Sequence, residues 1–360
     1  MQRKGTVVIA MSGGVDSSVS AALLVEQGYT VIGMMLTLWS EKGYEAENRC
    51  CTPDSLRLAK MVAAQLNIPF YVVDAKKPFY DEVVTSFIQD YQSGITPNPC
   101  LKCNRLIRWG LLFGYAKEME ADYFATGHYA LIQRDRSKQC QLLRAKDKTK
   151  DQTYFLHVLN QSEMEKTLFP IGNLLKSEVR QLAVQFKLPV AIRKDSQDLC
   201  FLSGADYRDF LMRNAPNSIQ PGNIYDKNHH LLGEHKGLAF YTIGQRKNLG
   251  VHSPKPLYVV KKDLENNSLI VGDKEDTLRR DFTVSGVNWL SGIPKKSRIH
   301  LGIKVRYQAP ILDGYLNLEE NNIVKVQLDD PYYDITPGQA AVFYQNDCCI
   351  GGGLITEEKD

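Results

Sequence analysis

Residues 6–18 read TVVIAMSGGVDSS and place two glycines between an apolar run and a helical run. Thr6–Met11 predicts a strand, and Val15–Gln27 predicts a helix. Gly13 and Gly14 let the backbone approach a ligand closely because they have no Cβ. The N–H groups at the start of a helix attract an anion. The segment therefore predicts a phosphate-binding turn between a strand and a helix.

Predicted strands and helices continue to alternate after this turn. Further strands are predicted at Tyr29–Leu38, Phe70–Val73 and Tyr123–Thr126, and further helices at Asp54–Leu66, Arg105–Glu118 and Lys176–Lys187. Strands separated by helices predict a doubly wound parallel sheet with helices on both faces, the α/β class. We expect this part, residues 1–205, to be one domain that contains the phosphate-binding turn.

The pattern changes after about Gly222, where short alternating runs replace helical periodicity. Leu257–Lys262 and Ser268–Val271 predict a hairpin. Later strands are predicted at Val284–Trp289, Ile299–Tyr307, Tyr315–Leu318, Ile323–Leu328 and Ala341–Tyr344. We therefore expect a small α+β domain at residues 206–280 and an all-β barrel at residues 281–360.

Composition excludes several classes of protein. The chain has 360 residues, 43% of them hydrophobic and 24% charged, and no apolar run approaches the roughly 18 residues of a membrane span. The apolar stretch near the amino terminus breaks at Ser12 before it could form a secretory signal. We expect a cytoplasmic protein with no membrane partner, whose eight cysteines are mostly thiols.

Charge is distributed unevenly. From Asp281 onward there are seven Lys and Arg against eleven Asp and Glu, although the whole chain carries +3. The densest basic stretch, Arg134–Lys150, has seven positive and two negative residues. It predicts either contact with a phosphate-rich partner or a solvated surface loop.

The glycine turn has neither the Walker lysine nor the G-x-G-x-x-G spacing of dinucleotide-binding turns. It matches the S-G-G-x-D-S pattern of the PP-loop ATP pyrophosphatases, which cleave ATP between the α and β phosphates and move AMP onto a carbonyl oxygen. An adenylated oxygen is a good leaving group, so a second nucleophile is expected to replace it. The alternative is a plain glycine turn in which Asp16 and Ser17 cap the helix.

Three cysteines are candidate nucleophiles: Cys100, Cys103 and Cys200. Cys103 is predicted near a helix start beside Lys102 and Arg105, and both features lower the pKa of a thiol. Taken alone, the C-x-x-C spacing also fits a redox pair, half a zinc site or coincidence. The other cysteines are expected to be structural: Cys50, Cys51, Cys140, Cys348 and Cys349.

With these motifs the chain resembles the bacterial tRNA-specific 2-thiouridylases, the MnmA family of the PP-loop superfamily. The resemblance covers nearly the whole length. Its motifs are Met11–Ser18, Thr96–Pro99 with Cys103 and Asn104, Ala125–Tyr129, Lys150–Leu156, Lys194–Phe201, Tyr241–Arg246 and Pro337–Tyr344. Such enzymes replace the 2-oxygen of the wobble uridine of tRNA by sulfur, using ATP and a cysteine persulfide.

The resemblance implies a role for each matching position. Cys200 would carry the persulfide and Cys103 would be the nucleophile. The ATP site would comprise Ala10, Met11, Ser12, Gly13, Gly14, Val15, Asp16, Ser17, Leu36 and Gly127. Asn98, Pro99 and Cys100 would line the target-base pocket, and the tRNA contacts would be His128, Lys150, Asp151, Gln152, Arg306, Tyr307 and Gln339. Singly, His128 also fits a hydrogen-bonded loop histidine, and Arg306–Tyr307 fits a surface pair of the barrel.

The resemblance also implies Mg²⁺ with the ATP, no metal site built from protein ligands, and a sulfur-donor protein (a cysteine desulfurase or a relay protein). Many family members have aspartate where this chain has Cys100. Three cysteines could then ligate an iron–sulfur cluster, although we favour persulfide chemistry. Two other functions remain open: another PP-loop tRNA-modifying or amidating enzyme, and a non-catalytic RNA-binding protein with a vestigial nucleotide site.

Overall fold

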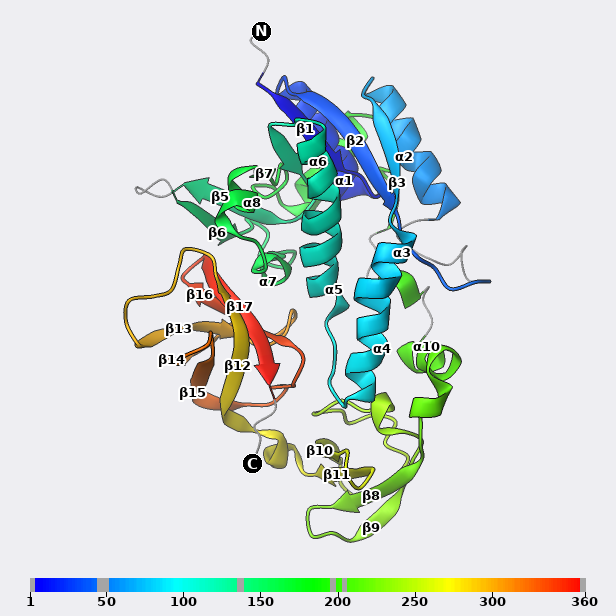
Figure 1. Cartoon of the computed structure of the whole chain (residues 1–360), viewed down its shortest axis with the longest axis vertical. Helices are drawn as coiled ribbons and strands as arrows, with labels where there is room; N and C mark the ends of the chain where they lie inside the picture. Colours follow the sequence, from blue (N-terminus) through cyan, green and yellow to red (C-terminus); the bar gives the residue numbers. More distant parts are fainter. Residues whose placement is uncertain (1–3, 44–51, 135–138, 195–198, 203–205, 357–360) are drawn as a thin grey trace. The chain divides into compact units, whose positions relative to one another are not determined.

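The structure, a computed structural model, describes residues 4–43, 52–134, 139–194, 199–202 and 206–356 (Figure 1). Cys50, Cys51 and the segment 195–198 of one family motif lie outside the described residues. The chain forms two compact units that are not contiguous in sequence. The first unit comprises Met1–Val84, Pro99–Ala205 and Asp347–Ile350, and the second comprises Thr85–Asn98, Asp206–Asn346 and Gly351–Asp360.

A parallel sheet forms the centre of the first unit. Its strands are β1 (Thr6–Ala10), β2 (Thr30–Thr37), β3 (Phe70–Asp74), β4 (Tyr123–Ala125) and β7 (Thr167–Leu168), in the order β3-β2-β1-β4-β7. β1 pairs in parallel with β2 on one side and with β4 on the other. The predicted parallel sheet is therefore confirmed.

Helices surround this sheet. They are α1 (Val15–Glu26), α2 (Pro53–Gln65), α3 (Lys76–Phe79), η1 (Tyr80–Val84), α5 (Pro99–Lys102), η2 (Cys103–Leu112), α6 (Phe113–Glu118), α7 (Thr153–Leu156), α8 (Gln161–Glu165), α9 (Lys176–Gln185) and η3 (Cys200–Leu202). A hairpin, β5 (Ala130–Arg134) and β6 (Cys140–Arg144), pairs through Leu142 and Leu143 with Cys349 and Cys348.

Neighbouring residues of β4 show that helices cover both faces. Ala125 belongs to the buried cluster that α1, α2 and α9 form. The ring centroid of the preceding residue, Phe124, lies 5.8 Å from that of Trp109 in η2 and 5.6 Å from that of Phe113 in α6. Because successive side chains of a strand point to opposite faces, these contacts lie on opposite sides. The doubly wound arrangement is confirmed.

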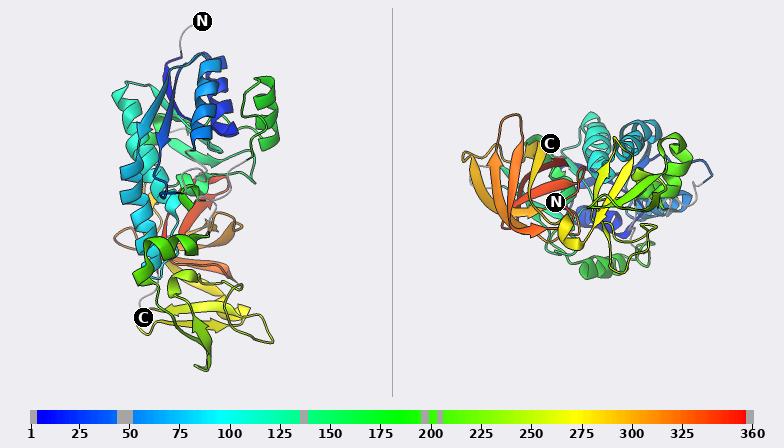
Figure 2. Two further views of the ribbon diagram at one scale, coloured as in Figure 1. Left: turned by 90° about the vertical axis from the view of Figure 1, so that its right-hand side faces the viewer. Right: turned by 90° about the horizontal axis from the view of Figure 1, so that it is seen from below.

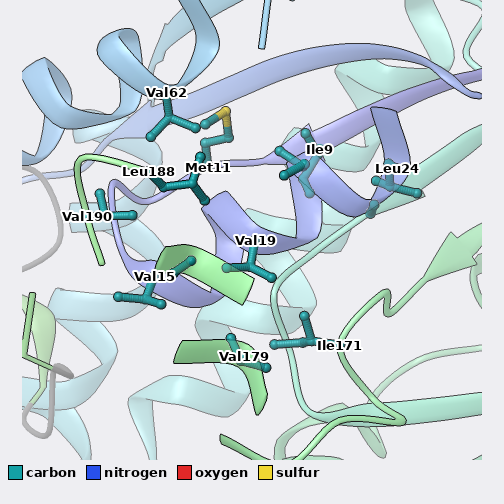
Figure 3. Close-up of a cluster of buried hydrophobic side chains, with 14 of the residues drawn as sticks. Ile9, Met11, Val15, Val19, Leu24, Val62, Ile171, Val179, Leu188 and Val190 are labelled. Carbon is teal, nitrogen blue, oxygen red and sulfur yellow. The ribbon is translucent and has the colours of Figure 1, made fainter. Parts of the chain in front are cut away.

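The buried cluster holds α1 against the sheet (Figure 3). Ile9 of β1 and Val19 of α1 are fully buried in it, together with Val62 of α2 and Val179 of α9. Burying an aliphatic side chain of this size contributes about 1.5–3 kcal/mol. The cluster therefore fixes the start of α1, and with it the glycine turn, on the end of β1.

The second unit contains a mixed sheet and a barrel, drawn from green to red in Figure 2. The mixed sheet has the order β10-β11-β8-β9, and β8 pairs in parallel with β11. Its elements, with the helices of this unit, are α4 (Thr85–Gln92), α10 (Tyr207–Asn214), η4 (Pro216–Ser218), β8 (Gly222–Asp226), β9 (Leu231–His235), η5 (Leu238–Phe240), β10 (Tyr258–Asp263), β11 (Ser268–Gly272) and η6 (Lys274–Thr277).

Six antiparallel strands form the barrel. They are β12 (Arg279–Trp289), β13 (Arg298–Lys304), β14 (Leu312–Leu318), β15 (Val324–Tyr332), β16 (Ala340–Gln345) and β17 (Cys348–Thr356). β12 pairs with both β15 and β17, and this second pairing closes the barrel. The expected central α+β region and all-β barrel are confirmed.

Several elements were not expected from the sequence, among them β5–β9, α4 and α10, and two further differences have a local cause. β17 was not predicted because Gly351, Gly352 and Gly353 interrupt its pattern. A Cβ on Gly351 would lie 2.5 Å from the carbonyl oxygen of Asn288, and one on Gly353 would lie 2.5 Å from that of Ser285. These glycines allow β17 to close against β12. The helix expected at Arg105–Glu118 begins earlier, since α5, η2 and α6 form one continuous helix (Figure 1).

Within the described ranges, no helix is long and apolar enough to cross a membrane.

Candidate active site

The glycine turn between β1 and α1 has a backbone that requires glycine at one position. Gly13 has φ +69°, and a Cβ there would lie 2.3 Å from the carbonyl oxygen of Ser55 in α2. Both the left-handed conformation and the close approach of α2 exclude other residues. Gly14, the N-cap of α1, makes no side-chain cap hydrogen bond because it has no side chain.

Serine hydroxyls hold the turn together. The Ser12 N–H donates to Ser17 Oγ at 3.2 Å, and the Ser12 and Ser17 hydroxyl oxygens lie 3.2 Å apart. Ser18 Oγ donates to the Gly14 carbonyl at 2.8 Å. This network closes the turn around the N-terminal end of α1, where backbone N–H groups can bind an anion.

Asp16 is engaged by two other side chains. Its carboxylate oxygens lie 2.7 and 2.8 Å from Lys176 Nζ, and Tyr129 OH donates to it at 3.0 Å. Among the described residues no three His, Cys, Asp or Glu side chains could together hold a metal ion. Mg²⁺ that arrives with ATP needs only one or two carboxylates in addition to phosphate and water oxygens. Asp16 fits that requirement, in competition with Lys176.

A cavity of about 230 Å³ adjoins the turn. It lies beyond the carboxyl ends of β1, β2 and β4, where the strand order reverses and where α/β sheets bind ligands. The described residues that line it are Ala10, Met11, Ser12, Asp16, Ser17, Met34, Met35, Leu36, Leu38, Cys103, Ile107, Arg108, Leu112, Thr126, Gly127, His128 and Gln152. The structure therefore brings most predicted ATP-site residues together with Cys103. Gly13, Gly14 and Val15 belong to the turn but are not among the lining residues.

The lining has an apolar side and a tightly packed side. Met34, Met35 and Leu36 come from β2 and offer an apolar wall. Gly127 packs against the start of α1, since a Cβ there would lie 2.7 Å from the Ser17 nitrogen. A larger residue at position 127 would push this segment away from the phosphate turn.

Cys103 reaches the cavity from η2, a π-helix. Such a helix has i→i+5 hydrogen bonds and is rare, and it is frequent at functional sites. Its wider turn puts Cys103, Arg108 and Leu112 on the side that lines the cavity. Cys103 lies one turn after the helix begins at Pro99, as the sequence predicted.

The remaining described cysteines are not among the lining residues of the cavity. Cys100, in α5, and Cys200, the first residue of η3, are half-buried in the first unit, and neither is among the described cavity residues. Pro99 is buried beside Cys100. Cys140 and Cys349 are buried and Cys348 is half-buried, which suits the structural role expected for them.

Most of the residues of the first unit that are expected to contact tRNA already have hydrogen-bond partners within that unit. His128 is 6% exposed, with Nδ1 2.7 Å from Thr126 Oγ1 and Nε2 3.1 Å from an Arg108 nitrogen. Asp151 is 3% exposed and accepts from the Ala145 N–H and from Thr153 Oγ1. These contacts favour the alternative interpretation of His128 as a hydrogen-bonded loop histidine.

Gln152 and Lys150 flank Asp151. Gln152 Oε1 accepts from the Tyr129 N–H at 2.9 Å, and Gln152 lines the cavity. Lys150 is half-buried. In the segment Lys150–Gln152, Gln152 is therefore part of the cavity wall, and Asp151 is held by hydrogen bonds within the first unit.

The basic stretch Arg134–Lys150 spans the β5–β6 hairpin and the loop after it. Several of its cations have carboxylate partners: Lys146 lies 3.0 Å from Glu178, Lys148 lies 2.8 Å from Asp347, and Arg144 lies 3.6 Å from Asp151. Its excess positive charge is partly neutralised within the first unit.

In the second unit, two predicted residues 241 positions apart meet. Asn98 Nδ2 donates to Gln339 Oε1 at 3.5 Å, and Gln339 Nε2 donates to the carbonyls of Thr96 and Pro97 at 3.0 and 3.1 Å. Gly338 allows this approach because it has φ +90° and a Cβ there would lie 2.1 Å from Ile95 Cγ2. The structure thus joins a predicted base-pocket residue to a predicted tRNA contact.

Arg306 and Tyr307 lie in the barrel. The Arg306 guanidinium donates to the Asp334 carbonyl and to Thr336 Oγ1, while Lys304 Nζ lies 5.6 Å from the centroid of the Tyr307 ring. Both side chains are half-buried, so the surface-pair interpretation also fits them.

Four residues around the turn were missed by the sequence analysis. Lys176 and Tyr129 contact Asp16, and Arg108 contacts His128. Arg193 donates to the Gly13 carbonyl at 2.8 Å and to Ser55 Oγ at 2.7 Å, which ties the turn to α2. Tyr129 lies in the Ala125–Tyr129 motif, whereas no motif marks the other three. Lys176 and Arg193 reach the turn from distant segments, and Arg108 reaches His128 from η2.

Comparisons with known proteins agree along the whole chain. The family described as the tRNA methyl transferase HUP domain matches residues 5–204, the tRNA methyl transferase PRC-barrel domain matches 208–273, and the aminomethyltransferase β-barrel domain matches 279–355. The tRNA-specific 2-thiouridylase MnmA of Natranaerobius thermophilus is 45% identical over 99% of this chain and 98% of the relative. That of Magnetococcus marinus is 42% identical over 99% of this chain and 100% of the relative. The chain therefore belongs to the MnmA family of tRNA-specific 2-thiouridylases.

Proposed function

We propose that this chain catalyses ATP-dependent 2-thiolation of the wobble uridine of tRNA, as a tRNA-uridine 2-sulfurtransferase. The observation that carries the proposal is the single cavity into which both the phosphate turn and the Cys103 thiol open. The domain descriptions name a tRNA methyl transferase, whereas the relatives are named 2-thiouridylases. An ATP-type phosphate turn beside a cysteine favours sulfur transfer.

ATP would bind with its phosphates on residues 10–17 and its adenosine against Leu36 and Gly127. Asp16 is the carboxylate that would hold Mg²⁺, which when bound neutralises charge on the departing pyrophosphate. Asn98, Pro99 and Cys100 would surround the target uracil. The base must leave its stack to reach such a site.

The first half-reaction activates the base. The uracil 2-oxygen attacks the α-phosphorus, an O–P bond forms, and the bond to the β-phosphate oxygen breaks, so that pyrophosphate leaves with the electron pair. The 2-oxygen then belongs to an AMP leaving group. The backbone N–H groups of the turn stabilise the charge that develops on the phosphates.

The second half-reaction transfers sulfur. The outer sulfur of a Cys200 persulfide becomes bonded to uracil C2, directly or as hydrosulfide released when Cys103 attacks the inner sulfur. AMP leaves with the former 2-oxygen, the persulfide S–S bond breaks, and Cys103 and Cys200 become a disulfide while two thiol protons pass to solvent. A reductant must open this disulfide before the next turnover.

Other partners follow from this chemistry. The persulfide requires a sulfur-donor protein, a cysteine desulfurase or a relay protein, in the cytoplasm where tRNA is modified. His128, Lys150–Gln152, Arg306–Tyr307 and Gln339 are kept as proposed tRNA contacts, with the basic stretch adding attraction for phosphates. Persulfide chemistry remains our proposal over an iron–sulfur cluster.

Nucleoside mass analysis of tRNA tests the proposal. Cells that lack this protein should lose 2-thiouridine at the wobble position, and the purified protein should restore it with ATP and a persulfide donor. Loss of a different modified nucleoside would indicate another PP-loop enzyme. Pyrophosphate release that needs ammonia or an amino acid rather than a thiol would indicate an amidating enzyme. No tRNA-dependent pyrophosphate release would indicate a non-catalytic RNA-binding protein.

A further inference from the structure

Arg108 supplies the cavity with its fixed positive charge. Among the described residues that line the cavity, Arg108 is the one lysine or arginine and Asp16 is the one carboxylate. Arg108 comes from η2, and it lies five residues after Cys103. With i→i+5 hydrogen bonding, a spacing of five places both side chains on one face of the helix.

His128 holds the Arg108 guanidinium. The imidazole Nε2 lies 3.1 Å from an Arg108 terminal nitrogen, and Nδ1 lies 2.7 Å from Thr126 Oγ1. Because a guanidinium only donates hydrogen bonds, Nε2 must accept, and the ring proton must sit on Nδ1 and be donated to Thr126. The ring is packed beside Trp109 and Phe169, with centroid distances of 5.7 and 6.1 Å.

This geometry requires a neutral imidazole, and the surroundings favour one. Burial and the adjacent Arg108 charge hold the pKa of His128 well below its usual range. The ring therefore stays an acceptor at neutral pH. A carboxylate would neutralise the charge of the guanidinium. A buried neutral acceptor instead fixes the guanidinium and leaves its positive charge in place.

The covalent structure of the adenylated uracil indicates which phosphoryl group lies near Arg108. In that species the 2-oxygen is bonded to both C2 and the α-phosphorus, so the phosphorus lies two bonds from the carbon that accepts sulfur. Cys103 must reach the inner sulfur of the Cys200 persulfide, whose outer sulfur becomes bonded to this carbon. A cation on the same helix face as Cys103 is therefore placed beside the α-phosphoryl group. The planar fork of a guanidinium suits the oxygens of such a group.

We propose that Arg108 binds the α-phosphoryl group of ATP and of the adenylated uracil, and that His128 is the positioning residue that orients its guanidinium. This inference rests on the proposed function, and it gives His128 a role inside the cavity in addition to its proposed contact with tRNA.

Calorimetric titration of the full-length protein with three ligands tests it: ATP, AMP and adenosine. Arg108→Met should weaken ATP and AMP binding about tenfold or more, the loss of a charge-assisted hydrogen bond, and should leave adenosine binding unchanged. Arg108→Lys, which keeps the charge, should recover part of the loss. Arg57→Met, which removes an exposed arginine of α2, is the matched control and should bind all three ligands like the wild type.

His128 variants separate positioning from folding. His128→Gln places an amide oxygen near Nε2 that can accept from Arg108, so ATP and AMP should bind within about threefold of the wild type. His128→Phe keeps the ring contacts but has no acceptor, and it should weaken ATP and AMP binding without affecting adenosine. Equal weakening of adenosine binding in Arg108→Met or His128→Phe would mean a merely structural role and would overturn the inference.

Two further outcomes are distinguishable. ATP and AMP binding that Arg108→Met leaves unchanged would overturn this inference alone, with the proposed function intact. Failure of the wild type to bind ATP would overturn the proposed function as well.

Discussion

Asp16 shows how one side chain in the turn serves several partners. Its carboxylate pairs with Lys176 and accepts from Tyr129, yet it is also the carboxylate that the proposed Mg²⁺ site needs. The Lys176 side chain is 12% exposed and that of Asp16 is 32% exposed, so the pair lies at the edge of the cavity. Binding of Mg²⁺ to Asp16 would require Lys176 to withdraw or to turn toward the phosphates.

We predict that Asp16→Ala reduces tRNA-dependent pyrophosphate release by at least about 100-fold, a size typical of losing one transition-state contact. The melting temperature should fall by only a few degrees, because partly exposed ion pairs contribute about 1 kcal/mol or less. Asp54→Ala, which removes an exposed carboxylate paired with Arg57, is the control. Undiminished pyrophosphate release by Asp16→Ala would contradict the assignment of the turn.

The two proposed reactive cysteines are expected to fail in different ways. Cys200→Ser protein should not accept transferable persulfide sulfur, whereas Cys103→Ser protein should accept it and then stall. Both should still release pyrophosphate, since neither thiol takes part in cleaving ATP. Radiolabelled sulfur loading and pyrophosphate release, measured on the same preparations, check this; Cys140→Ser is the control.

After one turnover without reductant, peptide mapping of the wild type should find a disulfide between Cys103 and Cys200. Their Cα atoms must then come within about 7 Å. Full multiple-turnover thiolation by either serine variant would rule out the mechanism, even if the ATP and tRNA assignments stood.

At the scale of elements, the β5–β6 hairpin and the loop after it carry the basic stretch. Arg144, Lys146 and Lys148 pair with carboxylates there. A cation that already has a carboxylate partner releases fewer counterions from a bound nucleic acid than an unpaired one. The stretch should therefore contribute less to the affinity for tRNA than its number of positive charges suggests.

We predict that replacing Lys146, Lys148 and Lys150 by Ala makes the dependence of log affinity for tRNA on log salt less steep. The slope should change by about one to two rather than three, since each phosphate contact contributes about one. Titrations at several salt concentrations measure it. A variant with Lys60, Lys117 and Lys187 replaced by Ala removes the same charge outside the stretch and should keep the wild-type slope. Identical slopes in all three proteins would identify the stretch as a solvated loop.

At the scale of the whole molecule, buried histidines couple stability to pH. His157 is 3% exposed, and burial lowers its pKa from 6.5 to about 4, against the opposing effect of its Nδ1 bond to the Tyr154 carbonyl. In the unfolded chain the ring takes up a proton near pH 6.5, whereas in the folded chain it does so only near pH 4. Its contribution to stability is therefore present above pH 6.5 and is lost as the pH falls toward 4.

We predict that the free energy of unfolding of the first unit falls on going from pH 7.5 to pH 5, by about 2 kcal/mol from His157 alone. His157→Asn can keep the hydrogen bond to Tyr154 but does not titrate. It should be less stable at pH 7.5 and should lose less stability at pH 5. Urea unfolding at both pH values measures this, with His252→Asn, an exposed position, as control. Equal losses in the wild type and His157→Asn would show that other groups dominate.

The alternation of β1–β4 with helices and the glycine turn after β1 could be predicted from the sequence, because hydrophobic periodicity and the need for residues without a Cβ act over short distances. The all-β character of the last part was predictable for the same reason, except β17, whose three glycines conceal a strand. The boundaries proposed after residues 205 and 280 remain a prediction. So do the roles carried over to individual site residues.

Other features depend on contacts between segments far apart in the chain. Lys176 reaches Asp16 across 160 positions, Arg193 reaches Gly13 across 180, and Gln339 reaches Pro97 across 242. A side chain's local sequence carries no sign of such a partner, because the contact exists only once the sheet and barrel have formed. The sequence alone thus determined the family and the glycine turn between β1 and α1. Only the tertiary structure decided that His128 is buried against Arg108 and that Cys103 opens into the same cavity as the turn, since packing of distant elements sets which side chains share a space.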